Sequence, residues 1–515
     1  MIDDSTTSEC GGIETVSPSS AATATQRGGL APLRRIAVNT TSLLTSDVLN
    51  RATTFAVYAM VARFCGPTSF GQLSLGLMLL YTFQVFASAG LPTLLMREVA
   101  KRPDASDRYF ANASVLAVCT SVLSILALYL LALVSRYPSD TTEVILLLGI
   151  GVLPWSLTTI AESVLRAWER MHWIIVIALP VNVVKIGLSY YLLSTGHDVR
   201  AVALVFLGCY CATVAVEWLL LFRYMRVQLA SLQFGFARDL ARRTWRFLGI
   251  EGLIAVWGSI NTVLLSWFAG EAAVGLFAAA WQLLVPVSMV LQAIGNSLFP
   301  MMCRRAADSN VRLRQLTVLM LEILMILAVP GCILLYFGAG PIILAVYGHD
   351  GFDGSALVMR IMLPVLLMQA VCNTFGQVLF SQGKEHVTLR ISATNAVFNA
   401  ICGIVLIYSF GAPGAAMSVL LTWALNGYLH FVAVREWLTD EAGKTLPWSN
   451  TLIWKVAVAG SIMAGALALA DQLNFILASV LTSVLYLAVL AAFVYAACQG
   501  SMGLRERFLV PLGEP

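Results

Sequence analysis

Several charged side chains lie inside long apolar runs, where an ionised group is costly and by default marks a functional site. Asp47 and Arg51 are four residues apart, so they share one helical face and could pair with each other. Lys185 has only apolar neighbours along the chain and no obvious partner on its own helix, and Arg360 lies in a later run. An environment of low dielectric constant strengthens the attraction of such cations for an anion. Arg51, Lys185 and Arg360 are therefore our candidates for substrate binding, while the alternative for Asp47 and Arg51 is a packing pair.

Four glutamates lie toward one end of their apolar runs, at Glu162, Glu217, Glu251 and Glu322. A carboxylate in this position can take up and release a proton that is exchanged for a transported substrate. We select Glu251 and Glu322, together with Asp47, as candidate ion-coupling residues. The alternative is that the glutamates only reach water at the head groups or pair with nearby arginines.

The elements that hold these charges must be membrane helices. Of the 515 residues, 59% are hydrophobic and only 12% are charged, about half of the charged share that soluble domains carry. This composition excludes a soluble protein and excludes disorder for nearly the whole chain. The ten cysteines lie mostly inside apolar runs without a C-x-x-C pair, which argues against a disulfide scaffold or a metal clamp.

The chain divides into apolar runs of about twenty residues, the length that crosses a hydrocarbon layer of ~30 Å. They are continuous rather than alternating, so they predict helices and exclude a barrel. The sequence therefore predicts an all-α polytopic membrane protein with fourteen transmembrane helices, six before a polar loop and eight after it. The predicted spans are 36–62, 72–95, 111–135, 143–165, 173–195, 201–222, 247–269, 275–299, 316–337, 355–380, 389–410, 414–434, 453–472 and 475–497.

The basic residues test this topology independently. With the N-terminus inside and strict alternation, 26 of the 32 lysines and arginines fall in inside segments or at the inner ends of spans, and three fall outside. This bias follows the positive-inside rule, and a missed helix would have scrambled it. The sequence thus predicts an even number of spans with both termini cytoplasmic.

We divide the chain at its longest polar connection. Residues 1–34 are rich in Ser, Thr, Ala and Gly and are predicted to form a disordered cytoplasmic tail. The other predicted units are an N-lobe of six spans at 35–222, a cytoplasmic linker at 223–246, a C-lobe of six spans at 247–434, an added helix pair at 435–497 and a cytoplasmic tail at 498–515.

The two lobes resemble each other in their turn signals. Gly66 and Gly71 bracket the connection after the first span, and Gly270 and Gly275 bracket the corresponding connection of the second half. A second pair of segments aligns without gaps, LRAWERMH from Leu165 and LFSQGKEH from Leu379. The offsets of 204 and 214 residues indicate one duplication, and parallel repeats of this kind are typical of transporters. The alternative is that glycine turns between short-looped helices look alike without common origin.

Polar amides also lie within the predicted spans. They either line a cavity or form hydrogen bonds between helices. They are Asn182, Asn261, Asn373, Asn395, Asn399 and Asn426.

Common signatures of enzymes and channels are missing from the sequence. There is no G-x4-G-K-[ST] phosphate loop, no H-E-x-x-H and no T-V-G-Y-G filter. The longest loop holds about 24 residues, too few for a soluble catalytic domain. We therefore expect no enzymatic activity, no catalytic residue, no cofactor, no metal and no nucleic-acid partner.

Three segments resemble the polysaccharide-transporter family of Wzx-type lipid-linked oligosaccharide flippases, in the multidrug/oligosaccharidyl-lipid/polysaccharide exporter superfamily. The first is ARFCGPTSFG from Ala62, close to the family pattern A-R-x-L-G-P-x-x-F-G. The second is AGLPTLLMREVA from Ala89, close to G-L-x-x-x-L-x-R-E-x-A, and LIYSFGAPGAA from Leu406 resembles a later turn. Phe64 and Cys65 depart mildly from the first pattern.

The resemblance implies two six-helix lobes around a cationic central cavity that opens alternately to each side. It implies a polyprenyl-pyrophosphate-linked oligosaccharide as substrate, moved across a bacterial inner membrane for cell-surface or exopolysaccharide synthesis. It further implies contact with membrane lipid and, as partners, a glycan polymerase and co-polymerase. Exchange against protons or sodium occurs in some relatives.

Two other classes of protein remain open. One is a small-cation or drug antiporter of the related multidrug branch, whose cavity should be acidic at mid-depth. The excess of Arg51, Lys185 and Arg360 over Asp47 favours an anionic cargo instead. The other is a scaffold that organises glycan synthesis, which gives no reason for Lys185 at mid-membrane.

Overall fold

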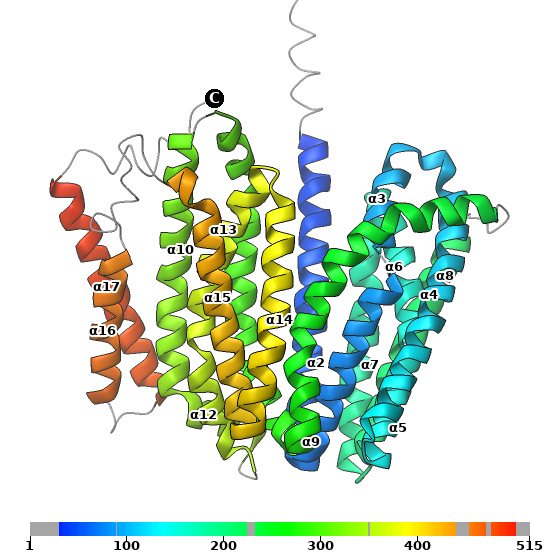
Figure 1. Ribbon diagram of the computed structural model, residues 1–515, viewed down its shortest axis with the longest axis horizontal. Coiled ribbons are helices and arrows are strands. Elements are labelled where there is room, and N and C mark those ends of the chain that lie inside the picture. The colour runs from blue at the N-terminus through cyan, green and yellow to red at the C-terminus, as the bar shows by residue number, and fades with distance from the viewer. Residues whose placement is uncertain are drawn as a thin grey trace, which may run out of the picture.

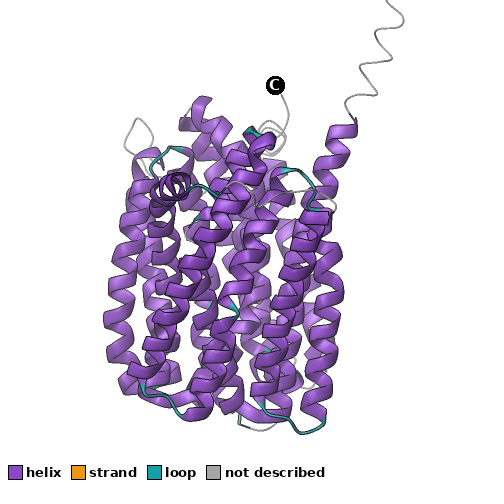
Figure 2. Ribbon diagram, turned by 90° about the vertical axis from the view of Figure 1, so that its right-hand side faces the viewer, coloured by secondary structure: helices purple, strands orange, loops and turns teal. Residues whose placement is uncertain are grey.

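The computed structural model describes residues 30–88, 90–223, 232–308, 310–348, 351–438, 453–469 and 475–500. These parts of the chain form helices joined by short turns, without strands (Figure 2). The helices are α2 (Leu30–Ser88), α3 (Leu91–Lys101), η1 (Pro103–Ala105), α4 (Ser106–Ser135), α5 (Ser139–Ile150), α6 (Val152–Ala167), α7 (His172–Ser194), α8 (Val199–Arg223), α9 (Phe234–Asp308), α10 (Asn310–Phe337), α11 (Ala339–Tyr347), α12 (Asp353–Met362), α13 (Pro364–Ser381), α14 (Glu385–Phe410), α15 (Ala412–Leu438), α16 (Ile453–Leu469) and α17 (Phe475–Gly500).

The predicted class of fold is confirmed. Within the described residues, 11 helical stretches are long and apolar enough to cross a membrane, and α16 is a shorter apolar helix. Two of the stretches, Thr45–Ser88 and Glu251–Arg304, bend at a glycine and have room for two crossings each. Counted in this way, the described helices agree with the fourteen predicted spans.

The two bent helices turn at corresponding glycines. Gly66 has φ 77° and ψ −175°, and Gly270 has φ 80° and ψ 178°. Glycine adopts a positive φ without the steric penalty that a Cβ atom brings. Gly66 and Gly270, which the sequence places at corresponding turns, therefore end the first crossing of each lobe in the same backbone conformation. We call the end of the molecule that carries these two turns the outer end, and the opposite end the inner end.

The two outer turns also pack directly on each other. A Cβ atom at Gly71 would overlap the backbone carbonyl of Glu271, and a Cβ atom at Gly275 would overlap the carbonyl of Pro67. The contacts are reciprocal, because Glu271 and Pro67 hold equivalent positions in the two turns. We call this contact of Gly71 and Gly275 with the opposite turn the glycine interlock. It requires residues without side chains on both lobes.

The helices form two bundles with an added pair at one side (Figure 1). The first half of the chain, α2 to α8, forms one bundle, and α9 to α15 form the other. We keep the names N-lobe and C-lobe for them. Helices α16 and α17 pack on each other and on α10, at the edge of the C-lobe. The predicted tail lies outside the described residues except for its last five, which begin α2.

The predicted linker is partly helical and contacts the N-lobe. Residues 224–231 lie outside the described part, and α9 begins at Phe234. Leu240 joins a buried cluster that is otherwise built by the N-lobe. Arg108 of α4 lies 4.2 Å from the ring centroid of Phe236 and donates a hydrogen bond of 2.6 Å to Gln233. The start of α9 thus lies on the inner end of the N-lobe before the chain enters the C-lobe.

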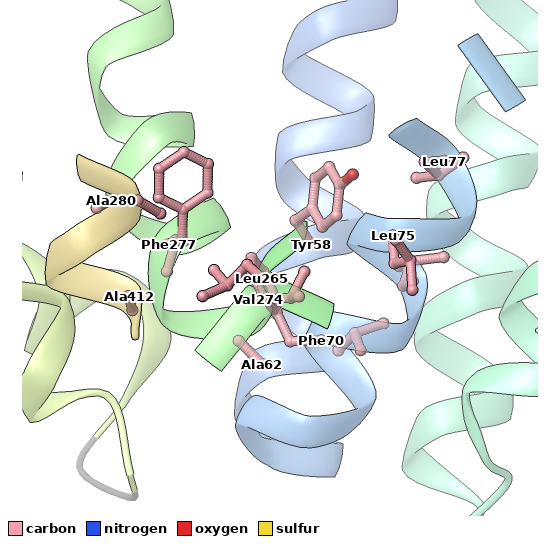
Figure 3. Packing of buried hydrophobic residues seen from close by; sticks show 14 of the residues in the cluster. Tyr58, Ala62, Phe70, Leu75, Leu77, Leu265, Val274, Phe277, Ala280 and Ala412 are labelled. Carbon is pink, nitrogen blue, oxygen red and sulfur yellow. The ribbon is translucent and has the colours of Figure 1, made fainter. Parts of the chain in front are cut away.

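Among the described residues, the largest buried cluster is shared between the lobes and surrounds the outer turns. This cluster joins residues of both lobes around the outer turns, among them Phe70, Leu265 and Val274 (Figure 3). Toward the inner end the core divides, with one cluster around Leu94 and Val164 in the N-lobe and another in the C-lobe. The lobes therefore share a core around the outer turns and have separate core clusters toward the inner end.

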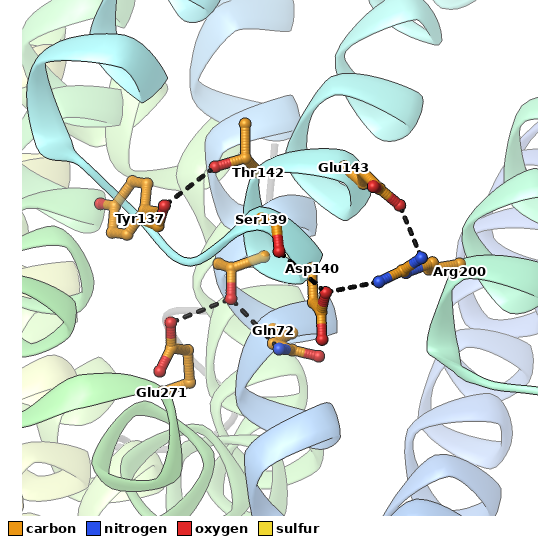
Figure 4. Close-up of polar contacts among 9 residues, drawn as sticks. Gln72, Tyr137, Ser139, Asp140, Thr142, Glu143, Arg200 and Glu271 are labelled. Carbon is orange, nitrogen blue, oxygen red and sulfur yellow. Dashed lines mark hydrogen bonds and ion pairs between the residues drawn. The ribbon is translucent and has the colours of Figure 1, made fainter.

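Hydrogen bonds between the lobes follow the same division. At the outer end, Thr141 of α5 donates to Glu271 of α9 over 2.9 Å, and Gln72 donates to Thr141 over 3.1 Å (Figure 4). Tyr137 and Ser266 share a hydrogen bond of 2.9 Å. Arg63 donates to backbone carbonyls of α11, including that of Val346 at 2.9 Å. These bonds close the outer end of the interface.

Candidate functional site

The N-lobe positions its predicted charges on α2 and α7, which pack against each other. Asp47 and Arg51 are both exposed, and no ion pair joins them among the described contacts. Between them, Asn50 accepts a hydrogen bond of 2.6 Å from Asn182 of α7. The two helices are thus held together through amides, which leaves Asp47 and Arg51 free of each other.

Lys185 is buried inside the N-lobe, with 9% of its surface exposed. Its Nζ atom lies 5.2 Å from the ring centroid of Phe206 on α8. In the described part of the chain it forms no hydrogen bond and no ion pair. A cation over an aromatic face gains some stabilisation, yet its hydrogen-bond donors stay available. The predicted lone cation is therefore buried in the N-lobe, and its charge has no ion-pair partner among the described residues.

Arg360 lies elsewhere, at the outer end of the C-lobe. It projects from the exposed face of α12, and its Nε atom donates a hydrogen bond of 3.2 Å to the carbonyl of Tyr336 at the end of α10. Its guanidinium lies 5.3 Å from the Tyr336 ring centroid. The structure does not bring Arg360 together with Arg51 and Lys185, so its predicted role in binding stays a prediction.

The inner glutamates fall into two groups. Glu162 of α6 forms an ion pair of 2.6 Å with Arg166 and interacts electrostatically with Asp47 and with Glu217 of α8. Glu217 is 1% exposed, and its Oε2 atom has no hydrogen-bond partner. The N-lobe therefore holds several carboxylates around one arginine, so the alternative of pairing with inner arginines holds for Glu162.

The two selected glutamates lie in the C-lobe half of the chain. Glu251 is exposed on α9 near the start of its first crossing, and Glu322 is half-buried on α10. The group of charges around Arg166 is built from N-lobe helices. The predicted role of Glu251 and Glu322 in ion coupling, like that of Asp47, stays a prediction.

The C-lobe interior is built from neutral amides. Asn261 of α9 donates to Asn399 of α14 over 3.0 Å, and Asn395 donates to Asn426 of α15 over 2.7 Å. The Asn399 oxygen also accepts from hydroxyl groups of α15, at 3.0 Å from Ser418 and 3.1 Å from Thr422. These contacts join α9, α14 and α15, as hydrogen bonds between membrane helices commonly do. Most of the predicted asparagines thus connect helices.

A cavity of about 650 Å³ lies beside this network, between α9, α13, α14 and α15. Asn426 and His430 line it on α15 and are buried, whereas Phe380 and Glu385 at its inner end are exposed. Asn373 lines it from α13. The two interpretations of the span asparagines therefore both hold, since some bond between helices and others line a cavity.

Sequence reasoning missed this cavity and the group around Arg166. Trp257, Trp423 and Gln377 line the cavity, but along the chain they look like ordinary members of apolar spans. Their common signal is an amide or indole within several C-lobe spans. For Glu162, the spacing of four residues to Arg166 is the signal that identifies its partner.

Two helical bundles with a common outer core and polar interiors define a two-lobed membrane transport protein of the multidrug/oligosaccharidyl-lipid/polysaccharide exporter superfamily. The chain belongs to the family described as polysaccharide biosynthesis protein, whose sequence model matches residues 36–305, more than half of the chain. The model of the MatE family matches residues 250–405. The resemblance predicted from the sequence is thereby confirmed.

Curated relatives come from an archaeon and a bacterium. The chain is 22% identical to a probable low-salt glycan biosynthesis flippase of Haloferax volcanii, over 84% of this chain and 89% of the relative. It is 26% identical to a putative O-antigen transporter of Shigella dysenteriae, over 36% of this chain and 46% of the relative.

Solved structures share the fold at low sequence identity. A lipid II flippase MurJ in an inward closed conformation superimposes with a TM-score of 0.73 at 13% identity, covering 89% of this chain and 99% of that one. An inward-facing multidrug resistance MATE family transporter superimposes with a TM-score of 0.62 at 13% identity, covering 75% of this chain and 93% of that one.

Proposed function

We propose that the protein is a flippase that moves a polyprenyl-pyrophosphate-linked oligosaccharide across a bacterial inner membrane, for cell-surface or exopolysaccharide synthesis. The observation that carries the proposal is the buried, unpaired cation Lys185 inside a two-lobed transporter of the polysaccharide biosynthesis family. A flippase named for glycan biosynthesis matches most of the chain, which supports the same substrate class.

The mechanism follows from the division between the two ends. A substrate enters from the inner end, where the lobes pack separately. Its pyrophosphate binds Lys185 and Arg51 in the N-lobe, because charged hydrogen bonds are strong away from bulk water. Rocking of the lobes then separates the outer turns and opens the site to the other side. Asp47, Glu251 and Glu322 are the residues proposed to exchange a coupling ion.

Reconstitution tests this function directly. Proteoliposomes would carry the lipid-linked glycan that accumulates in cells lacking the gene, and periodate, which does not cross the bilayer, would report the exposed glycan. The protein is expected to transfer glycan between leaflets until nearly all of it is oxidised, whereas liposomes without protein should stop near half. Oxidation that stops near half with the protein present contradicts the proposal.

A second function is an antiporter for small organic cations, favoured by the MatE match over residues 250–405. The same proteoliposomes separate the two functions. Efflux of ethidium driven by an imposed proton or sodium gradient, without movement of glycan, identifies the antiporter. The reverse result identifies the flippase.

The proposed orientation places both termini in the cytoplasm, with a glycan polymerase and co-polymerase acting on the far side of the membrane. Alkaline phosphatase is active only outside and green fluorescent protein fluoresces only inside. Fusions after Arg507 and in the connection between Gly348 and Gly351 should therefore report opposite sides. If they report the same side, the assigned topology is wrong.

A further inference from the structure

Aromatic side chains line the C-lobe cavity. Trp257 of α9 and Trp423 of α15 both line it, and their ring centroids are 5.4 Å apart with the planes tilted by 44°. Phe380 lines the cavity near its inner end. Flat aromatic rings bury large apolar area at little conformational cost. They suit a ligand that has an apolar face of its own.

Between these rings the cavity presents amide and hydroxyl groups. Gln377 of α13 and Thr388 of α14 line it, and the Oε1 and Oγ1 atoms of these side chains are buried without a hydrogen-bond partner. A buried polar atom left unpaired costs free energy, so such atoms normally meet water or a ligand. The cavity thus offers unused hydrogen-bonding groups beside aromatic surfaces.

The cavity lacks the charge that a phosphate needs. Among the described residues that line it there is no lysine or arginine, and the charged one is Glu385 at the inner end. A carboxylate repels an anion, whereas neutral amides and hydroxyls bind hydroxyl groups well. A ring with an apolar face and a rim of hydroxyl groups fits this lining, and a volume of about 650 Å³ lies in the range of small-molecule sites.

We propose that this cavity binds an uncharged sugar ring of the lipid-linked glycan, while the N-lobe cations bind its pyrophosphate. The inference rests on the proposed function and adds a second contact site on the other lobe. Trp257 and Trp423 stack on the apolar face of the ring, and Gln377 and Thr388 bond its hydroxyls. The C-lobe therefore binds the sugar, and the N-lobe binds the pyrophosphate, which is common to all such lipids.

Two lipids separate the two sites in a binding experiment on the purified full-length protein. One is the lipid-linked glycan extracted from cells lacking the gene, and the other is undecaprenyl pyrophosphate without sugar. Gln377→Met removes the unpartnered amide while keeping the side-chain length, so the fold should be retained. Gln369→Met is a matched control, because Gln369 lies on the same helix with an equally unpartnered Oε1 atom and does not line the cavity.

Gln377→Met is expected to weaken binding of the glycan-bearing lipid by about tenfold and to leave the sugar-free lipid unchanged. Trp423→Leu should act in the same direction, and Gln369→Met should change neither lipid. If Gln377→Met weakens both lipids equally, or neither, the sugar site is wrong. If the wild-type protein binds neither lipid, the proposed function is wrong. This result differs from a failure of the sugar site alone, because in that case the wild-type protein still binds lipid.

Discussion

The N-lobe and the C-lobe share an architecture but differ in the chemistry of their interiors. The offset of 214 residues that aligns Leu165 with Leu379 also relates Lys185 to Asn399. Lys185 lies on α7, which packs on α2 and α8, and Asn399 lies on α14, which packs on α9 and α15. One position therefore holds an unpaired cation, and the corresponding position holds an amide that bonds Asn261, Ser418 and Thr422.

This difference separates the features that the two lobes share from those in which they differ. The backbone features that join the lobes are the same in both, as the matching conformations of Gly66 and Gly270 show. The interiors are free to diverge, because each lobe has its own core cluster toward the inner end. One lobe can then bind the anionic part of a substrate while the other lobe binds its neutral part.

The strongest test of the comparison replaces the N-lobe cation. Lys185→Met should reduce glycan transport by about 100-fold, since losing one partner of a buried charged contact costs several kcal/mol. The fold should be retained or stabilised, because a lone mid-membrane lysine costs ~2.5–3.5 kcal/mol on insertion scales. Lys185→Arg should keep part of the activity. Transport is measured by periodate accessibility in proteoliposomes, at equal amounts of protein.

The control for Lys185→Met is Asn399→Leu, at the corresponding position of the C-lobe. This change breaks the hydrogen bonds with Asn261, Ser418 and Thr422, so it should lower the unfolding temperature while sparing the pyrophosphate site. Normal transport by Lys185→Met, with normal protein levels in the membrane, would show that the charge has no role in binding.

The second test addresses the feature that the lobes have in common. Gly71→Ala and Gly275→Ala each place a Cβ atom into a backbone carbonyl of the opposite turn, and overpacking of this kind costs about 1–3 kcal/mol. Both variants should destabilise the closed outer end to a similar extent. The measurement is the labelling rate, by a thiol reagent that does not cross the membrane, of a cysteine introduced at Glu271.

Gly208→Ala is the matched control, because a Cβ atom at Gly208 meets no atom within 4 Å. It should leave the labelling rate unchanged. Unequal effects of Gly71→Ala and Gly275→Ala would mean that the interlock is not symmetric, and no effect from either would mean that the outer turns already separate in the resting protein.

A smaller effect is expected from the charges on α2. The double change Asp47→Asn with Arg51→Gln removes both charges, so neither is left uncompensated. Because Arg51 is exposed whereas Lys185 is buried, transport should fall by about tenfold, less than for Lys185→Met. Comparing the double variant with each single one shows whether the residues act together. Strictly additive single effects would mean that they act independently.

Much of this fold was predictable from composition and charge. The apolar runs, the bias of basic residues and the G-x4-G turns are local signals, since membrane thickness sets span length and a positive φ favours glycine. The reciprocal contact of Gly71 with Glu271 was not predictable, because it depends on how two distant turns meet. The same holds for the cavity, since Trp257, Gln377 and Trp423 come together only when three separate helices pack.

The sequence also could not show which way a charge points. Lys185 and Arg360 look alike along the chain, each a cation within an apolar run. The buried face of α7 carries Lys185 into the lobe, whereas α12 turns Arg360 to its exposed side. Helical rotation decides between these outcomes, and the apolar run on α7 is too uniform to fix it.

The smallest effect is expected from Arg360→Gln. A role in substrate binding, as the sequence predicts, requires a loss of transport comparable with that of Lys185→Met. The exposed position of Arg360 and its contacts with the carbonyl and ring of Tyr336 instead favour a change of less than about fivefold, since exposed charge contacts are usually worth less than ~1 kcal/mol. Transport assays on Arg360→Gln and on Arg360→Lys, which keeps the charge, decide between the two. If Gln loses transport as strongly as Lys185→Met does and Lys restores it, the substrate must reach the outer end of the C-lobe, and the division of anionic and neutral contacts between the lobes would have to be redrawn.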